Sequence, residues 1–187
     1  MVLPRRKPMS EDEFLAFDAL QVEKQEFVGG QAHAMTGASI RHNRVSGNLF
    51  ARLHAAVAGS PCLPLINDVK LRLDEGRIYY YPDVMLVCDP TDDDPLIRSR
   101  PCLIAEVASP STATIDRREK WISYQRIQTL REYLILDQDE PRVEVYRRDG
   151  LRSWIIETLG PEDTLHIACL DGLAIPVAEL YANLPPP

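Results

Sequence analysis

The chain has 187 residues, of which 45% are hydrophobic, so it can bury the core of one globular domain without disulfides or a structural metal. We expect one domain over residues 1–187, with flexible tails at 1–9 and 183–187. The net charge of −7 argues against sequence-independent coating of nucleic acid, which needs clustered Lys and Arg. No apolar run approaches the roughly 18 residues that span a bilayer, and the basic N-terminus lacks the apolar stretch of a signal peptide. We therefore expect a soluble, cytoplasmic protein with no membrane contact.

The four cysteines are scattered along the chain, at Cys62, Cys88, Cys102 and Cys169, with no Cys-x-x-Cys pair. Three of them lie inside apolar runs. We interpret them as small buried hydrophobic residues and expect neither a zinc site nor a disulfide.

The N-terminal sequence predicts a helix followed by a β-hairpin. Ser10-Glu-Asp-Glu13 has the pattern of a capping box, which predicts a short helix through about Ala19. The pair Gly29-Gly30 suits a two-residue turn, which predicts a hairpin between strands at 23–28 and 31–35.

The middle of the chain predicts one long helix and four strands. Apolar residues recur every four positions from 39 to 58, as in a helix that packs on a sheet. Alternating apolar and polar residues predict antiparallel strands at 69–74 and 78–81. The short, nearly continuous apolar runs 84–88 and 102–107 are typical of central strands that are covered on both faces.

The C-terminal third predicts a helix, three strands and a short final helix. Ser111 or Thr112 can cap a helix that continues to about Gln128. Asp149-Gly150 is a hairpin turn within a set of strands at 132–136, 142–147 and 151–158, and a short helix is expected near 177–181. The fold class is therefore α/β (α+β), with a mixed central sheet flanked by helices and β-hairpins at both ends.

Two carboxylates flank the central strands. Adjacent strands could bring Asp83 and Glu106 together, where two like charges are unfavourable unless a cation neutralises them. Mg²⁺ suits such a site, because it accepts one or two carboxylates and keeps several waters. Alone, Asp83 is more simply a strand-start residue after proline, whereas a carboxylate inside Leu-Ile-Ala-Glu-Val is costly to bury unless it is paired or bound to metal.

The pair formed by Pro82-Asp83 and Glu106 resembles the two-carboxylate core of the PD-(D/E)XK nucleases. A longer set of residues is similar to one branch of that superfamily, the restriction-endonuclease-like family often called the Uma-two endonucleases. That set comprises Ile104-Ala-Glu-Val-Ala-Ser-Pro-Ser-Thr112, Asp116, Lys120, Tyr124 and Leu130-Arg-Glu-Tyr-Leu-Ile-Leu-Asp137. The similarity extends from the 26–30 hairpin to the 173–180 tail and implies a restriction-endonuclease-like fold.

The resemblance also implies a catalytic lysine two residues after the second acid, but Ala108 occupies that position. We expect Lys120 to replace it, because Asp116, Lys120 and Tyr124 lie at i, i+4 and i+8 on one face of the predicted helix. Lys120 would then orient the attacking water and stabilise charge on the phosphate. Without the resemblance, the simpler interpretation is a solvent-exposed salt bridge between Asp116 and Lys120.

Several further residues are candidates for the site. The Val107 carbonyl would be a third metal ligand. Glu26 of the opening hairpin matches a family glutamate that would hold the metal through a water or complete the acid cluster, although alone it is more simply a solvated strand residue. His42 could contact substrate or carry a proton, although an exposed first-turn histidine is the simpler interpretation. Asp116 and Tyr124 complete the set.

These features lead to two functional hypotheses. The resemblance implies an endonuclease dependent on Mg²⁺ (or Mn²⁺) that hydrolyses DNA through Asp83, Glu106 and Lys120. The alternative is a catalytically lapsed nuclease-fold module used for binding or assembly, which Ala108 and the acidic net charge favour. A homodimer that pairs through its hairpins is compatible with either function.

Overall fold

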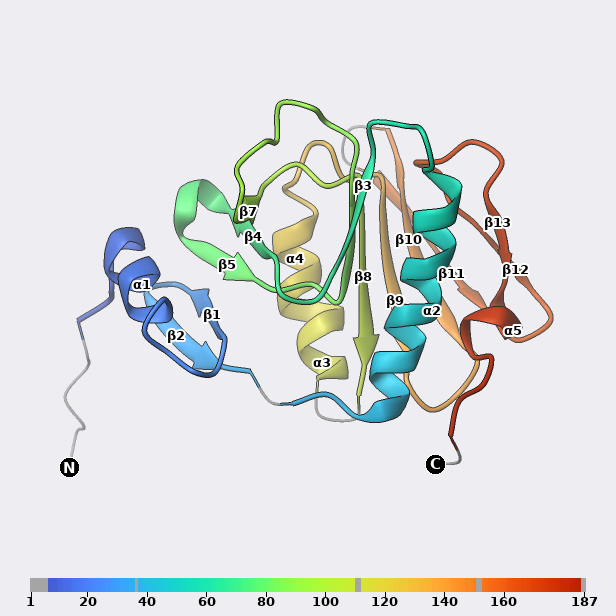
Figure 1. Ribbon diagram of the computed structural model, residues 1–187, viewed down its shortest axis with the longest axis horizontal. Coiled ribbons are helices and arrows are strands. Elements are labelled where there is room, and N and C mark those ends of the chain that lie inside the picture. The colour runs from blue at the N-terminus through green and yellow to red at the C-terminus, as the bar shows by residue number, and fades with distance from the viewer. Residues whose placement is uncertain (1–6, 36, 110–111, 151–152, 186–187) are drawn as a thin grey trace.

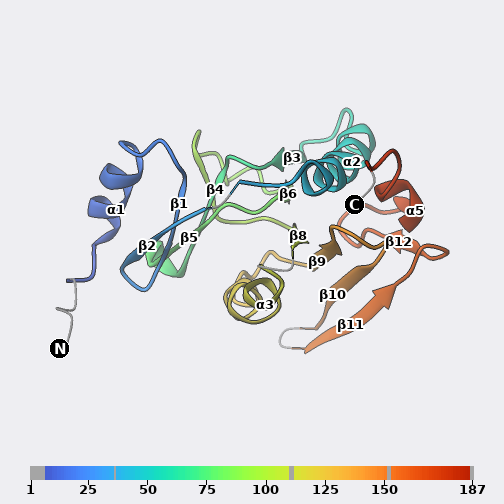
Figure 2. The ribbon, with the colours of Figure 1, turned by 90° about the horizontal axis from the view of Figure 1, so that it is seen from below.

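The computed structural model of this chain describes residues 7–35, 37–109, 112–150 and 153–185. These residues form a six-stranded sheet, a five-stranded sheet and a two-stranded ribbon. The six-stranded sheet lies between helical layers, and the five-stranded sheet extends from it toward the N-terminal helix (Figure 1, Figure 2). The mixed sheet flanked by helices confirms the expected fold class. Within the described ranges, no helix is long and apolar enough to cross a membrane.

The N-terminal helix α1 (Glu11–Asp18) begins with the predicted capping box. The Ser10 hydroxyl accepts a hydrogen bond from the Glu13 N–H, and the Glu13 carboxylate accepts one from the Ser10 N–H. Both bonds satisfy backbone donors that a helix start leaves without partners. The buried Phe14 of this helix stacks on Phe27 of the following hairpin, with ring centroids 4.5 Å apart.

The five-stranded sheet contains that hairpin. In spatial order its strands are β2 (Gln31–Ala34), β1 (Gln25–Val28), β5 (Ile78–Tyr80), β4 (Lys70–Leu73) and β7 (Ile97–Arg98). The turn between β1 and β2 requires glycine, since Gly29 and Gly30 have φ angles of 59° and 86°. A short 3₁₀ turn, η1 (Asp74–Gly76), joins β4 to β5.

The six-stranded sheet forms the centre of the molecule. In spatial order its strands are β11 (Ser153–Leu159), β10 (Val143–Asp149), β9 (Glu132–Asp137), β8 (Leu103–Ala108), β6 (Val84–Val87) and β3 (Leu63–Ile66). Strand β8 runs parallel to β9 and antiparallel to β6. Every residue of β6 and β8 is buried, which confirms that the two apolar runs are central strands.

Two apolar cores cover the opposite faces of this sheet. The long helix α2 (Ile40–Ala56), which the apolar periodicity predicts, packs against one face through Val45, Leu49 and Leu53, and Ser39 caps its N-terminus. The second core contains Tyr124 and lies on the other face. The ribbon of β12 (Thr164–His166) and β13 (Ala174–Pro176) and the predicted final helix, α5 (Val177–Leu180), join the first core.

The helical segment between β8 and β9 differs from the sequence expectation. It consists of α3 (Ala113–Ile115), a π-helical turn η2 (Asp116–Lys120) and α4 (Trp121–Tyr124), and so ends before Gln128. Thr112 makes no capping hydrogen bond through its side chain, and Ser111 lies outside the described residues. The Tyr133 hydroxyl donates a hydrogen bond to the Asp116 main-chain carbonyl oxygen at 3.1 Å. A side chain from β9 thus satisfies one carbonyl group of the π-helical turn.

The expectation that the cysteines form no disulfide was wrong. Cys62 and Cys88 are joined, with their Cα atoms 4.1 Å apart, because the pairing of β3 with β6 places them opposite each other. Spacing of 26 residues along the chain gives no sign of this pairing. Strands β3, β7, β12 and β13 were also not predicted, since they are short and lack a clear alternation of apolar residues.

Both ends of the described chain contact the domain. The Met9 N–H donates to the Gly30 carbonyl at 2.9 Å, and the Arg41 guanidinium donates to the Pro185 carbonyl. The remaining parts of the tails expected to be flexible, 1–6 and 186–187, lie outside the described residues.

We predict that Arg148→Lys destabilises the fold by about 1–3 kcal/mol. The Arg148 guanidinium donates to three main-chain carbonyls after α4, those of Gln125, Ile127 and Leu130, at 2.7–3.1 Å. A lysine ammonium cannot form the same planar fork. Urea unfolding measures the change, and Arg126→Lys is the control, because the Arg126 side chain is 62% exposed. Equal stability of the two variants would contradict this role.

Candidate active site

The centre of the candidate site is Glu106, a carboxylate on the central strand β8. Its neighbours Ala105 and Val107 face the core under α2, so alternation directs Glu106 to the opposite face, toward η2 and α4. Only 3% of the residue is exposed. Glu106 Oε1 accepts a hydrogen bond from the Tyr124 hydroxyl at 2.7 Å and one from the Lys120 ammonium at 3.1 Å.

Asp83 lies directly before β6 and next to Glu106. The last antiparallel pair of β6 with β8 joins Val84 to Ala105, so the next step in register sets Asp83 opposite Glu106 on the same face. Asp83 Oδ2 accepts the Val107 N–H at 2.7 Å and lies 3.1 Å from His42 Nε2. The two carboxylates therefore meet at one end of adjacent central strands, as the sequence predicted.

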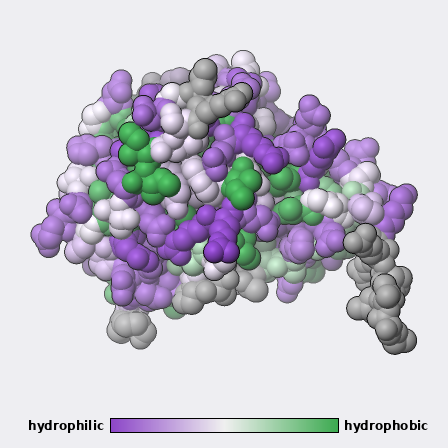
Figure 3. All heavy atoms as spheres, turned by 180° about the vertical axis from the view of Figure 1, so that it is seen from behind, coloured by the Kyte–Doolittle hydropathy of each residue, from purple (hydrophilic) through white to green (hydrophobic). Residues whose placement is uncertain are grey.

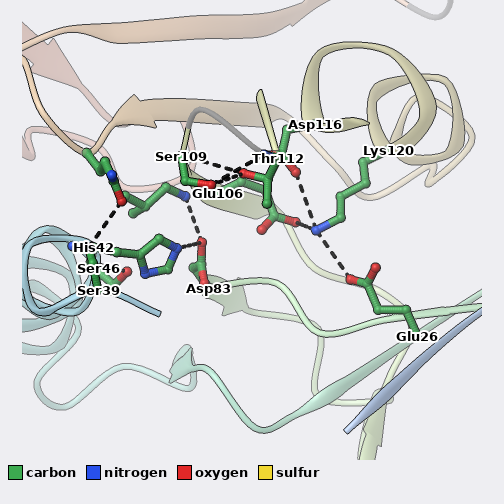
Figure 4. A network of polar contacts seen from close by, with 12 residues as sticks. Glu26, Ser39, His42, Ser46, Asp83, Glu106, Ser109, Thr112, Asp116 and Lys120 are labelled. Carbon is green, nitrogen blue, oxygen red and sulfur yellow. Dashed lines mark hydrogen bonds and ion pairs between the residues drawn. The ribbon is translucent and has the colours of Figure 1, made fainter. Parts of the chain in front are cut away.

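The Lys120 ammonium occupies the space between three carboxylates (Figure 4). It lies 3.1 Å from Glu106, 3.3 Å from Glu26 and 3.4 Å from Asp116, and its side chain is 9% exposed. The helical segment thus brings Lys120 to Glu106, while Ala108, at the position expected for the superfamily lysine, is buried in the apolar core that also contains Tyr124. The alternative of a solvent-exposed Asp116–Lys120 salt bridge was wrong, because both residues are buried.

Glu26 and His42 also differ from their simpler interpretations. The Glu26 side chain, from β1, is 18% exposed and points toward Lys120 instead of into solvent. The His42 side chain, from the first turn of α2, is 15% exposed because it contacts Asp83. His42 of α2 thus reaches Asp83, and Glu26 of the hairpin reaches the Lys120 ammonium that contacts Glu106.

Burial and mutual repulsion alter the proton affinities in this cluster. Burial, together with the nearby Asp83 and Asp116 carboxylates, raises the pKa of Glu106 to about 8, although Lys120 opposes this change. Burial likewise raises the pKa of Asp116. Burial disfavours the charged form of Lys120, but the surrounding carboxylates outweigh it and raise the Lys120 pKa.

The donor set fits a hard divalent cation in part. Three carboxylates contact one ammonium, and the buried Glu26 Oε1, 3.3 Å from that ammonium, makes no hydrogen bond. Oxygen donors with excess negative charge are what Mg²⁺ and Mn²⁺ prefer. Among the residues that the structure describes, however, no three acidic, histidine or cysteine side chains are arranged to ligate one ion. The arrangement therefore suits a site with two protein carboxylates and several waters better than a closed protein cage.

The residues after β8 and one buried tyrosine complete the surroundings. The Ser109 N–H donates a hydrogen bond to the Thr112 hydroxyl oxygen at 3.1 Å. Ser109 and Thr112 thus partner each other in the turn that follows β8. The Tyr80 hydroxyl donates to Glu119 at 3.2 Å, and its ring centroid lies 5.6 Å from the Lys120 ammonium. Sequence reasoning missed Tyr80, because one of three consecutive tyrosines cannot be singled out by pattern alone.

The fold has a counterpart among solved structures. Its structure matches a crystal structure described as a putative nuclease belonging to DUF820 from Anabaena variabilis, with a TM-score of 0.77 at 15% identity over 94% of this chain and 98% of that one. At this identity the match shows the fold alone.

The family itself is shown by sequence. Residues 11–178 match the Uma2 family, described as "Putative restriction endonuclease", and the chain belongs to that family. Two relatives come from Synechocystis sp., and both are described as uncharacterized proteins. The protein sll1609 is 35% identical over 87% of this chain and 94% of its own length. The protein slr1290 is 30% identical over 94% of this chain and 93% of its own length.

We predict that the stability of the protein depends on pH through Glu106. Because the folded-state pKa is raised from 4.5 to about 8, the folded protein holds this proton more tightly than the unfolded chain. The free energy of unfolding should therefore fall as the pH rises through this window. Glu106→Gln cannot titrate and should lack this fall, so the stability of the wild type relative to the variant should drop by more than about 1 kcal/mol between about pH 5 and about pH 8.

Urea unfolding in the presence of a chelator measures this difference, since bound cations would alter the titration. Glu140→Gln, at an exposed position, is the control. A difference between wild type and Glu106→Gln that stays constant with pH would contradict the prediction.

Proposed function

We propose that the protein is a metal-dependent endonuclease that hydrolyses phosphodiester bonds of DNA at the site formed by Asp83, Glu106 and Lys120. The observation that carries the proposal is the Lys120 ammonium, held 3.1 Å from Glu106 on the same face of the sheet as Asp83. A lysine beside two strand carboxylates is the constellation that the family resemblance implies, here with the lysine supplied by the helical segment. Membership of a family described as "Putative restriction endonuclease" supports DNA as the substrate.

Each residue of the site would have a separate role in the reaction. Asp83, Glu106 and the Val107 carbonyl would hold Mg²⁺ or Mn²⁺. The bound cation would supply Lewis-acid polarisation of a phosphate oxygen and a lowered pKa for a water. The Lys120 ammonium would donate a hydrogen bond to the attacking water and to the charge that develops on the phosphate. Tyr124 orients Glu106 through its hydroxyl, and His42 orients Asp83.

A second candidate is supported by the burial of the site. The Lys120 ammonium already contacts three carboxylates, and the side chains of Lys120 and Glu106 are only 9% and 4% exposed. Water and phosphate would need space that these contacts fill. This observation favours the catalytically lapsed module, in which the buried charges hold the fold together and another surface binds a partner.

The expected homodimer also stays a prediction. Strand β11 is an edge of the six-stranded sheet, and its Ile155 and Ile156 are 54% and 58% exposed. An edge strand of this kind can pair with a second copy of the chain. The face opposite that of Figure 1 is largely hydrophilic, with hydrophobic residues in small separate groups, so any interface there would be limited in area (Figure 3).

We expect Mg²⁺ or Mn²⁺ to raise the melting temperature of the protein, because a ligand that prefers the folded state stabilises it. The gain should reach about 2.7 kcal/mol when the free cation is 100-fold above its Kd. Asp83→Asn should lose most of this gain, whereas Asp93→Asn, in an exposed loop, should keep it. Differential scanning calorimetry with and without cation gives the comparison. Equal cation-dependent shifts in both variants would refute Asp83 as a ligand.

We expect the wild type to nick supercoiled plasmid in Mg²⁺ or Mn²⁺, and Lys120→Met to nick it about 100-fold to 1000-fold more slowly, the usual loss for a charge-stabilising donor. Arg118→Met, which removes an exposed charge two residues away, is the matched control. Because removing Lys120 leaves buried carboxylates unneutralised, circular dichroism must confirm that the variant is folded.

Asp83→Asn keeps the test informative if Lys120→Met does not fold, since the Asp83 side chain is near the edge of the cluster, 15% exposed. Nicking at the wild-type rate by Asp83→Asn would show that the activity comes from elsewhere. A wild type that is folded, binds the cation and does not nick would support the lapsed module.

A further inference from the structure

The four cysteines of the chain gather at one end of the six-stranded sheet, away from the carboxylate cluster. Cys62 precedes β3, Cys88 follows β6, and Cys102 precedes β8. The three residues therefore lie next to the ends of neighbouring strands. The Cys169 thiol donates a hydrogen bond to the Cys102 carbonyl at 2.9 Å. Residues separated by more than 100 positions thus form one sulfur cluster in which every member is partly exposed.

A free thiol in this cluster touches the disulfide. Cys102 Sγ lies 3.7 Å from Cys88 Sγ, which is contact between two sulfur atoms. The position is fixed by the sheet, because the Cys102 N–H donates to the Leu86 carbonyl at 2.8 Å. Cys88 therefore has two sulfur neighbours, its bonded partner Cys62 and the thiol of Cys102.

The surroundings of Cys102 favour its reactive form. A hydrogen bond with Cys169 lowers the pKa of Cys102, while partial burial opposes that effect. The thiolate is the nucleophile in disulfide exchange, so a lowered pKa increases the fraction of Cys102 able to attack. Both the contact of Cys102 Sγ with Cys88 Sγ and the lowered pKa of Cys102 therefore indicate Cys102 as the attacking thiol.

We propose that Cys62, Cys88 and Cys102 form a thiol–disulfide exchange site in which Cys102 and Cys62 compete for Cys88. The Cys102 thiolate attacks Cys88 Sγ and forms a new S–S bond. The Cys62–Cys88 bond breaks, and its electron pair leaves on Cys62 Sγ, which takes up the proton that Cys102 lost. One disulfide and one thiol are present before and after, so the step needs no oxidant or reductant.

Exchange would change which strands are cross-linked. The bond between Cys62 and Cys88 ties β3 to β6, whereas a bond between Cys88 and Cys102 ties β6 to β8. Strand β6 follows Asp83 and β8 carries Glu106. The second state would therefore fix the two strands that present the carboxylate pair.

Disulfide mapping of the wild-type protein tests the proposal. Free thiols are alkylated in the folded state, the protein is digested with pepsin in acid to prevent later exchange, and linked peptides are identified by mass spectrometry. We expect peptides joined through Cys62–Cys88 and also peptides joined through Cys88–Cys102. Complete alkylation of Cys102, with Cys62–Cys88 as the sole linkage to Cys88, would overturn the proposal.

Variants of single thiols give a second test. In Cys62→Ser treated with oxidised glutathione, the Cys88–Cys102 bond should exceed mixed disulfides of Cys88 with glutathione by at least about tenfold, because the two sulfurs are held together. In the matched control Cys62→Ser/Cys102→Ser, Cys88 has lost both of its sulfur neighbours, so Cys88 should carry glutathione. Glutathione on Cys88 without the Cys88–Cys102 bond in folded Cys62→Ser would also overturn the proposal.

Discussion

The burial of a carboxylate on the central strand of the sheet constrains much of the surrounding architecture. Glu106 lies where neighbouring positions hold apolar side chains, and an ionised group there is unfavourable unless it is paired. The pairing comes from Lys120 and Tyr124, both on the helical segment that crosses from β8 to β9. Removal of one member of such a buried pair typically costs about 3–5 kcal/mol. The position of that segment is therefore tied to the buried carboxyl group beneath it.

The same constraint extends to parts of the chain that are distant in sequence. Glu26 reaches the ammonium from the opening hairpin, and His42 reaches Asp83 from α2. Replacing a buried ion cluster with apolar residues often stabilises a protein. Such a cluster therefore contributes less to the free energy of unfolding than well-packed apolar residues would. Retaining several uncompensated acids around one lysine is easier to understand if the acids also serve a ligand, which is the physical basis for preferring the enzyme over the lapsed module.

The sequence predicted the parts of the fold that follow from local periodicity. The capping box at Ser10, the Gly29-Gly30 turn and the apolar runs around Val84 and Leu103 each have one dominant structural solution. Glu106 could be identified because a carboxylate in an apolar strand is unusual. Lys120 could not be identified by periodicity, since an i, i+4 acid–base pair is usual on exposed helices, and only the family resemblance singled it out.

Properties that depend on how distant segments meet could not be predicted. The contact of His42 with Asp83 and the Cys62–Cys88 disulfide both depend on tertiary register, which residue spacing does not encode. Two-residue strands such as β7 are too short for a period to be visible.

The π-helical turn at Asp116–Lys120 sets the direction in which the later Tyr124 points toward Glu106. A π turn holds one more residue than an α-helical turn, so this stretch behaves as a local insertion. Winding the same residues as a regular α-helix would rotate every later position by about 100° and shift it by about 1.5 Å along the axis. Tyr124 would then leave the Glu106 carboxylate, although no residue had been changed. The π-helical winding of this segment therefore matters to the site as much as the identity of its residues.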